Sequence, residues 1–114
     1  MDNISAVKCT PCDIGASKIT DEDFENYRPQ IPNWNIIEEN GIKKIRREFK
    51  FKNFAEALKF TNCIGKLAED MQHHPAILTE WGKVEVTWWT HKIKGLNSND
   101  LIMALKTDIL LKTL

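Results

Sequence analysis

The sequence predicts an α+β fold in which a four-stranded antiparallel sheet carries helices packed on one face, in the order α-β-β-α-β-β-α. Asn40-Gly41 and Gly82-Lys83 each separate two runs rich in strand-forming residues, a pattern typical of hairpins and therefore of antiparallel pairing. A helix signature precedes each of these two hairpins, and a third signature closes the chain. Helices gathered on one side of the sheet would bury both apolar surfaces.

The composition fits one globular domain. The chain has 114 residues, of which 42% are hydrophobic and 28% are charged. Lys and Arg total 16, and Asp and Glu also total 16, so no net charge attracts nucleic acid or an anionic membrane. We find no apolar run of membrane-spanning length and no signal-peptide pattern at the first residues. We therefore expect a cytoplasmic protein with no membrane partner and no direct nucleic-acid partner.

The first 18 residues lack apolar periodicity. They predict a flexible N-terminal extension, followed by a single domain over residues 19–114. Cys9 and Cys12 have the spacing of zinc and redox sites, but a zinc site needs two more ligands. A metal or redox role and an incidental pair both stay open. With Cys63 the chain has three cysteines, too few for a disulfide framework, so reduced thiols are expected.

The first helix is expected after Thr20, where Asp23 can complete a capping box and Ile19 can staple onto Phe24. Prolines at positions 29 and 32 end it. In the strand that follows Asn40-Gly41, one face carries Ile45, Arg47, Phe49 and Phe51. Ile42 falls out of that register, which predicts a bulge or a later strand start. The lysines and arginines of residues 43–52 fit a solvated strand face better than a nucleic-acid groove.

A central helix opens at Asn53 and must end near His73, because Pro75 disfavours the helical conformation at His74. Two more strands follow, over residues 76–81 and 84–93. The second of these places Val84, Val86 and Trp88 on one face and Glu85, Thr87, Trp89 and His91 on the other. Asn97 then caps a last helix that runs almost to Leu114, with Asp100 at its third position.

The chain has only three histidines, and two of them are adjacent at the end of the central helix. His73 and His74 could be ordinary residues stabilised by the helix dipole, metal ligands or acid/base catalysts. His91 follows them by one hairpin, so all three imidazoles could meet at one rim of the sheet. Imidazole titrates near neutral pH and serves as acid or base. Three histidines could also hold zinc, although adjacent side chains converge poorly on one ion.

These histidines belong to a longer pattern. It consists of Glu69, His73, His74, Pro75, Trp81, His91 and Asp100, and it resembles in residue type and spacing the signature of the pterin-4a-carbinolamine dehydratases. Similar segments at "IPNWNI", "FKNFAEALKFTN" and "IKGLNSNDL" extend the resemblance over about residues 20–114. The resemblance implies dehydration of 4a-hydroxytetrahydropterin to quinonoid dihydropterin in tetrahydrobiopterin recycling, with no cofactor and no metal.

The resemblance also implies roles for individual residues. His73, His74 and His91 would be catalytic, with support or substrate contact from Glu69, Asp100, Pro75, Trp81 and Trp34. Structural alternatives remain for several of these. Asp100 suits a capping box, Glu69 can hold His73 by an i, i+4 contact, and Trp34 or Trp81 can simply pack in the core.

Partners follow from the same resemblance. It implies a pterin substrate and a homodimer or homotetramer. An alternative function is a protein-interaction module, because animal relatives act as dimerisation cofactors of a homeodomain transcription factor through an exposed helix surface. Phe60 and Cys63 lie beside the core stripe of the central helix and are the residues expected to supply such a surface.

Overall fold

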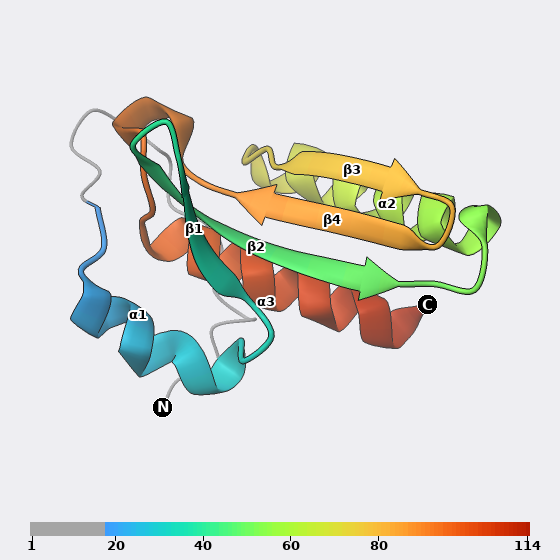
Figure 1. The fold of residues 1–114 in the computed structure, drawn as a ribbon, viewed down its shortest axis with the longest axis horizontal. Helices are drawn as coiled ribbons and strands as arrows, with labels where there is room; N and C mark the ends of the chain where they lie inside the picture. The colour runs from blue at the N-terminus through green and yellow to red at the C-terminus, as the bar shows by residue number, and fades with distance from the viewer. Residues whose placement is uncertain (1–17) are drawn as a thin grey trace.

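A computed structural model describes residues 18–114, and four strands form its sheet. These are β1 (Asn35–Glu39), β2 (Ile42–Lys50), β3 (Ala76–Glu80) and β4 (Lys83–Trp88), in the order β1-β2-β4-β3, with every neighbouring pair antiparallel. Helices α2 (Phe54–Met71) and α3 (Ser98–Thr113) pack on one face, and α1 (Asp21–Tyr27) lies beside β1 (Figure 1). The predicted fold class and element order are confirmed.

Most of the predicted N-terminal extension lies outside the described residues. This includes Cys9 and Cys12, so both interpretations of that pair stay predictions. Within residues 18–114, no helix is both long and apolar enough to cross a membrane.

Helix α1 begins as its sequence predicts. The Thr20 hydroxyl accepts from the Asp23 backbone N–H, and the Asp23 carboxylate accepts from the Thr20 N–H, both at 3.1 Å. Phe24 is buried beneath this turn. The helix passes into the 3₁₀ turn η2 (Arg28–Gln30), which contains Pro29. Because Pro29 has no backbone N–H to donate to the preceding turn, the regular α-helix ends at Tyr27.

The β1–β2 hairpin turns at Asn40 and Gly41, whose φ angles of 54° and 77° are both left-handed. Two such residues form the turn that best matches the twist of paired strands. Glu39 pairs directly with Ile42, so β2 starts at Ile42 and its ladder with β1 is continuous. The predicted bulge or late start is wrong. Ile42 lies on the face of the sheet away from the helices and is half-buried there.

The β3–β4 hairpin turns one residue earlier than predicted, at Trp81-Gly82, because Glu80 pairs with Lys83. Strand β4 also ends earlier, at Trp88, and His91 begins a second 3₁₀ turn, η3 (His91–Ile93). The expectation that His91 shares a strand face with Thr87 is therefore wrong. Beyond Trp88, the backbone of Thr90 pairs only with Gly95. The Thr90 hydroxyl bonds to Asp100 of α3, so the chain leaves the sheet at this point.

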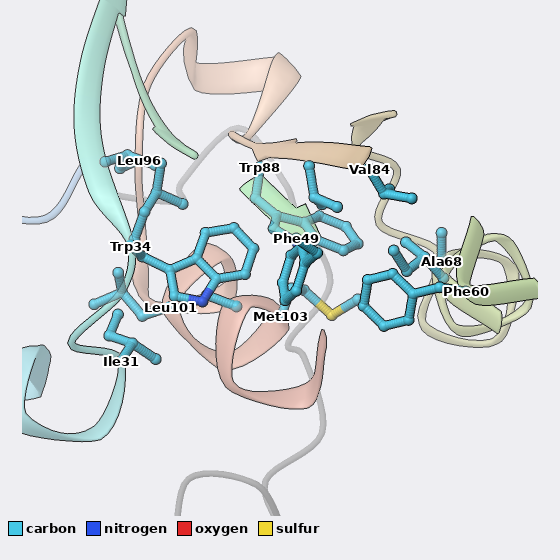
Figure 2. Packing of buried hydrophobic residues seen from close by; sticks show 14 of the residues in the cluster. Ile31, Trp34, Phe49, Phe60, Ala68, Val84, Trp88, Leu96, Leu101 and Met103 are labelled. Carbon is cyan, nitrogen blue, oxygen red and sulfur yellow. The ribbon is translucent and has the colours of Figure 1, made fainter. Parts of the chain in front are cut away.

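The core lies between the sheet and the two long helices (Figure 2). Phe49 of β2 is central to it, at 4.8 Å from the ring of Phe60 and 6.0 Å from the ring of Trp34. Full burial of one large apolar side chain contributes about 1.5–3 kcal/mol. The fully buried members include Trp34, just before β1, and from the strands and helices Ile45, Ala57, Phe60, Ile64, Val84, Val86, Trp88, Leu101 and Met103.

Burial of Phe60 corrects one expectation about helix α2. Phe60 is 0% exposed, so it supplies no outer surface, and Cys63 is half-buried. The large apolar residues that α2 exposes are Phe54, at 45%, and Leu58, at 43%. They lie in the first two turns of the helix, at its end farthest from His73.

Candidate active site

The end of α2 directs His73 and His74 to different environments. Gln72 adopts a left-handed conformation with φ 53° and ψ 42°. Its N–H bonds to the Glu69 carbonyl at 3.4 Å, and the His73 N–H bonds to the Ala68 carbonyl at 3.1 Å. This pair of bonds is the Schellman ending of a helix. After it His73 is buried, with 5% exposure, while the side chain of His74 is 54% exposed.

Asp100 lies directly beside His73. Its Oδ1 is 2.6 Å from Nε2 of His73, and its Oδ2 accepts from the Thr90 hydroxyl at 2.8 Å and the Asn97 N–H at 3.0 Å. The last of these bonds completes the predicted capping box of α3. The indole of Trp88 stacks near the His73 ring, with the ring centroids 5.8 Å apart and an angle of 19° between the ring planes. Asp100 therefore has both roles that the sequence left open, as a cap and as the histidine's partner.

Glu69 binds a different histidine from the one expected. Its Oε2 lies 2.5 Å from Nε2 of His74, five residues on, whereas the His73 ring turns away toward Asp100. Both members of the Glu69–His74 pair are largely exposed, at 72% and 54%. The predicted i, i+4 contact with His73 is wrong because the left-handed Gln72 rotates the chain between them.

His91 reaches the pair from η3. Its Nε2 donates to the backbone carbonyl of His74 at 3.2 Å, and its ring lies 4.5 Å from that of Trp89. Because a carbonyl oxygen only accepts, Nε2 must carry hydrogen in this bond. Two backbone bonds between Thr90 and Gly95, at 2.8 and 3.4 Å, close the loop that carries His91.

All three imidazoles line one cavity of about 130 Å³, together with Gln72, Thr90 and Lys92. The sequence analysis did not identify these last three residues, although each is directly adjacent to a histidine in the chain. A second hollow of about 210 Å³ lies between α1 and the β1–β2 hairpin. That hollow has no histidine in its lining, so it lacks the groups for acid/base chemistry near neutral pH.

Three other residues of the predicted site lie in different places. Pro75 is half-buried next to His74, at the entry to β3. Trp34 is 0% exposed in the core, and its Nε1 donates to Asp108 of α3 at 2.9 Å. Trp81 is 69% exposed at the β3–β4 turn, the end of the hairpin opposite to His91. Neither tryptophan belongs to the lining of the histidine cavity.

Among residues 18–114, no cluster of three or more His, Cys, Asp or Glu side chains is arranged to hold a metal ion. The two histidines that could share an ion differ in surroundings, since His73 bonds to Asp100 and His74 bonds to Glu69. The expectation that the protein uses no metal and no cofactor stays a prediction.

The protein is thus an α+β sandwich in which three histidines line one small cavity at the rim of the sheet. The chain belongs to the pterin 4 alpha carbinolamine dehydratase family, whose model matches residues 17–110. Two curated relatives, from Nitrosococcus oceani and Syntrophotalea carbinolica, are each 54% identical over 112 residues. The match covers 98% of this chain and 99% and 100% of theirs, and both are provisionally named pterin-4-alpha-carbinolamine dehydratases.

Solved structures give the same fold. A transcriptional coactivator/pterin dehydratase from Brucella melitensis superposes with a TM-score of 0.74 at 29% identity, covering 82% of this chain and 98% of that one. A pterin dehydratase-like protein, described as a RuBisCO assembly factor in the alpha-carboxysome, has a TM-score of 0.58 at 19% identity. That match covers 68% of this chain and 88% of the other, and it supports the fold alone.

Proposed function

We propose that the protein dehydrates 4a-hydroxytetrahydropterin to quinonoid dihydropterin and water, in the recycling of tetrahydrobiopterin. The observation that carries this proposal is the cavity lined by His73, His74 and His91, in a chain of the pterin 4 alpha carbinolamine dehydratase family. The sequence has no other histidine, so every imidazole of the chain lies at this cavity. Imidazole is the side chain best suited to move protons near pH 7.

The reaction needs two proton transfers. The bond between C4a and its hydroxyl oxygen breaks, and the oxygen leaves as water when an acid protonates it. A ring N–H of the pterin loses its proton to a base, so the reaction consumes no net proton. Each positioned transfer contributes typically about 10²- to 10⁴-fold to the rate. One imidazolium and one neutral imidazole at the same cavity are sufficient for both steps.

His73 fits the role of the acid. It is buried against the carboxylate of Asp100 at 2.6 Å, and a nearby negative charge compensates the positive charge of an imidazolium. The Thr90 hydroxyl and the Asn97 N–H hold the other carboxylate oxygen, so Asp100 is fixed in place. The ring can therefore present a proton at the cavity from one defined orientation.

His91 fits the role of the base. Its Nε2–H is committed to the His74 carbonyl, so a neutral His91 ring has its lone pair on Nδ1. That nitrogen is the one available to accept a proton. His74, held by Glu69, contacts the substrate from the solvent side, and Pro75 fixes the backbone that follows. We do not include Trp34 and Trp81 in the proposed cavity, because one is fully buried and the other lies at the far turn.

The decay of a freshly generated 4a-carbinolamine, followed with and without the protein, tests the proposal. We expect acceleration by the wild-type protein and a loss of at least about tenfold in His73→Ala and in His91→Ala. Far-UV circular dichroism checks that both variants keep the fold. Asn62→Ala, on the exposed side of α2, is the control and should retain the full rate. A wild-type protein that leaves the decay unchanged would defeat the proposal.

The remaining partners follow from the family. We propose a homodimer or homotetramer in the cytoplasm, acting on the pterin alone, without nucleic acid or membrane. Sedimentation equilibrium of the purified protein measures the subunit number directly, and a monomer at micromolar concentration would contradict this part of the proposal.

A second function is favoured by one observation. Helix α2 exposes Phe54 and Leu58 in its first two turns, and the Brucella melitensis structure is described as a transcriptional coactivator as well as a pterin dehydratase. The alternative is a protein-interaction module that docks a partner on this end of α2. Phe54→Ser and Leu58→Ser should then abolish binding of the partner protein while leaving the rate of carbinolamine dehydration unchanged. Loss of dehydration in both variants would contradict a separate interaction surface.

A further inference from the structure

His91 has few contacts of its own in spite of its place at the cavity. It is exposed and lies in a 3₁₀ turn of three residues, and its one side-chain hydrogen bond among the described residues goes to the His74 carbonyl at 3.2 Å. One hydrogen bond leaves an imidazole free to tilt about the donated N–H. A base that must meet a ring proton within hydrogen-bond distance needs a second restraint.

Trp89 supplies a surface on the other side of this ring. The two ring centroids are 4.5 Å apart at an angle of 42°, within the range of attractive aromatic contacts. Trp88, the preceding residue, points into the core, and Trp89 turns to the opposite side of the chain, where it is half-buried. The indole therefore lies between the outer face of the sheet and η3.

Lys44 fixes that indole from strand β2. Its Nζ lies 4.0 Å from the centroid of the Trp89 ring, which is close for a cation–π contact. Strand β2 pairs Ile45 with Trp88, and Lys44 and Trp89 are the next residues along the two antiparallel segments. The Lys44 side chain is only 13% exposed, so it is held in place more firmly than a surface lysine.

A carboxylate keeps Lys44 in this position. Glu39 Oε1 lies 3.1 Å from Lys44 Nζ, and Glu39 Oε2 lies 3.1 Å from Nη2 of Arg46. Arg46 in turn bonds to Glu85 at 2.7 Å and to the Thr87 hydroxyl at 2.9 Å. Bonds from Lys44 and Arg46 lower the pKa of the Glu39 carboxyl, so it stays charged. The outer face of β1, β2 and β4 thus forms a continuous ion-pair network that ends at Trp89.

We propose that Trp89 is a positioning residue, which holds the imidazole of His91 at the cavity and is itself held by Lys44. The inference rests on the proposed function, because it concerns the geometry of the base in that reaction. Trp89 does not touch the reacting atoms in this scheme. It restricts the His91 ring to one orientation, and the charged network on the sheet holds the indole that does so.

Four variants test this. Trp89→Leu removes the ring, Trp89→Phe keeps a smaller ring, and Lys44→Met removes the charge but keeps the aliphatic stem. Lys43→Met is the matched control, because Lys43 is the next lysine on the same strand and pairs with Asp21 at 3.6 Å instead. Each variant is measured for kcat, for KM and for the proton NMR shifts of the His91 ring, which are assigned by their loss in His91→Ala.

In the wild-type protein, the ring current of Trp89 should move the His91 carbon-bound protons upfield, and Trp89→Leu should abolish that displacement. We expect kcat to fall by about tenfold in Trp89→Leu with little change in KM, because a misplaced catalytic group loses rate rather than affinity. Trp89→Phe should recover most of the wild-type kcat. The kcat of Lys44→Met should lie between those of Trp89→Leu and the wild type, and the kcat of Lys43→Met should equal that of the wild type.

The two readouts separate this inference from the proposed function. If Trp89→Leu leaves either kcat or the His91 shifts at their wild-type values, the positioning role is wrong. Equal losses in Trp89→Leu and Trp89→Phe would also overturn it, since the aromatic ring would not be the cause. If the wild-type protein shows no dehydration, the proposed function fails, and the NMR comparison alone then decides whether Trp89 holds the His91 ring.

Discussion

Nε2 of His73 lies 2.6 Å from Oδ1 of Asp100, and both side chains are buried. The two residues come from different helices: His73 follows the end of α2, and Asp100 lies in the first turn of α3. The bond therefore ties the two helices of the layer together at the rim of the sheet. It also places a fixed carboxylate behind one imidazole of the cavity.

Asp100→Asn tests both consequences. An amide cannot match a carboxylate that accepts from His73, Thr90 and Asn97, so the free energy of unfolding should fall by about 1–3 kcal/mol. The rate of carbinolamine dehydration should fall by at least about tenfold, because His73 loses its compensating charge. Urea unfolding and the decay assay measure the two effects. Asp70→Asn, an exposed acid on α2, is the control. A variant with full activity would show that Asp100 is a helix cap and nothing more.

Glu69→Gln should separate activity from stability. The Glu69–His74 pair is exposed at both ends, and exposed ion pairs contribute about 0–1 kcal/mol. The free energy of unfolding should therefore change by less than about 0.5 kcal/mol. In contrast, kcat/KM should fall if His74 contacts the substrate. The comparison with Asp100→Asn is informative, because there both quantities fall. A large loss of stability in Glu69→Gln would mean that the pair is structural.

The elements of this fold follow closely from local patterns in the sequence. Thr20 with Asp23, and Asn97 with Asp100, are capping boxes whose reciprocal bonds form within four residues. Asn40-Gly41 needs only its own two left-handed conformations to form the turn. Signals of this kind are local, so one sequence is enough to read them.

The contacts that build the site depend on tertiary structure instead. The end of β4 at Trp88 depends on the hydrogen bond from the Thr90 hydroxyl to Asp100, which lies ten residues later in the chain. The pairing of Glu69 with His74 depends on a left-handed Gln72, and glycine, the usual residue at that position, is absent. The partner that accepts the N–H of the buried Trp34 is Asp108, 74 residues later in the chain. Neither the spacing of residues in the sequence nor their helix and strand propensities predicts these contacts.

Asp108 predicts a pH dependence of stability. Burial raises the pKa of its carboxyl above the usual value, and the bonds from Trp34 and Arg47 oppose this shift without cancelling it. A carboxyl whose pKa is raised by folding stabilises the native state fully below the unfolded pKa, and that contribution is lost as pH rises through the folded pKa. The penalty for ionising Asp108 therefore grows as pH rises above about 4.

Asp108→Asn removes this ionisation but keeps an acceptor for the Trp34 N–H. The free energy of unfolding of the variant relative to the wild type should therefore increase as pH rises from about 4 toward 7. Urea unfolding of both proteins at several pH values measures the difference, so the other titrating groups cancel. A difference that decreases over this range would mean that the ion pair with Arg47 outweighs burial.

Two glycines with equally open surroundings should respond to alanine in opposite directions. At both Gly41 and Gly65, an added Cβ would meet no atom within 4 Å, so no clash enters the comparison. Gly41 has φ 77° in the hairpin turn, and a side chain in the left-handed region costs about 1–2 kcal/mol, so Gly41→Ala should destabilise by that amount. Gly65 lies inside α2, where alanine is favoured over glycine by about 0.5–1 kcal/mol, so Gly65→Ala should stabilise. Chemical denaturation of both variants measures the two signs. Destabilisation by Gly65→Ala would mean that something approaches α2 at this position, such as a second copy of the chain, whereas Gly41→Ala depends only on the turn.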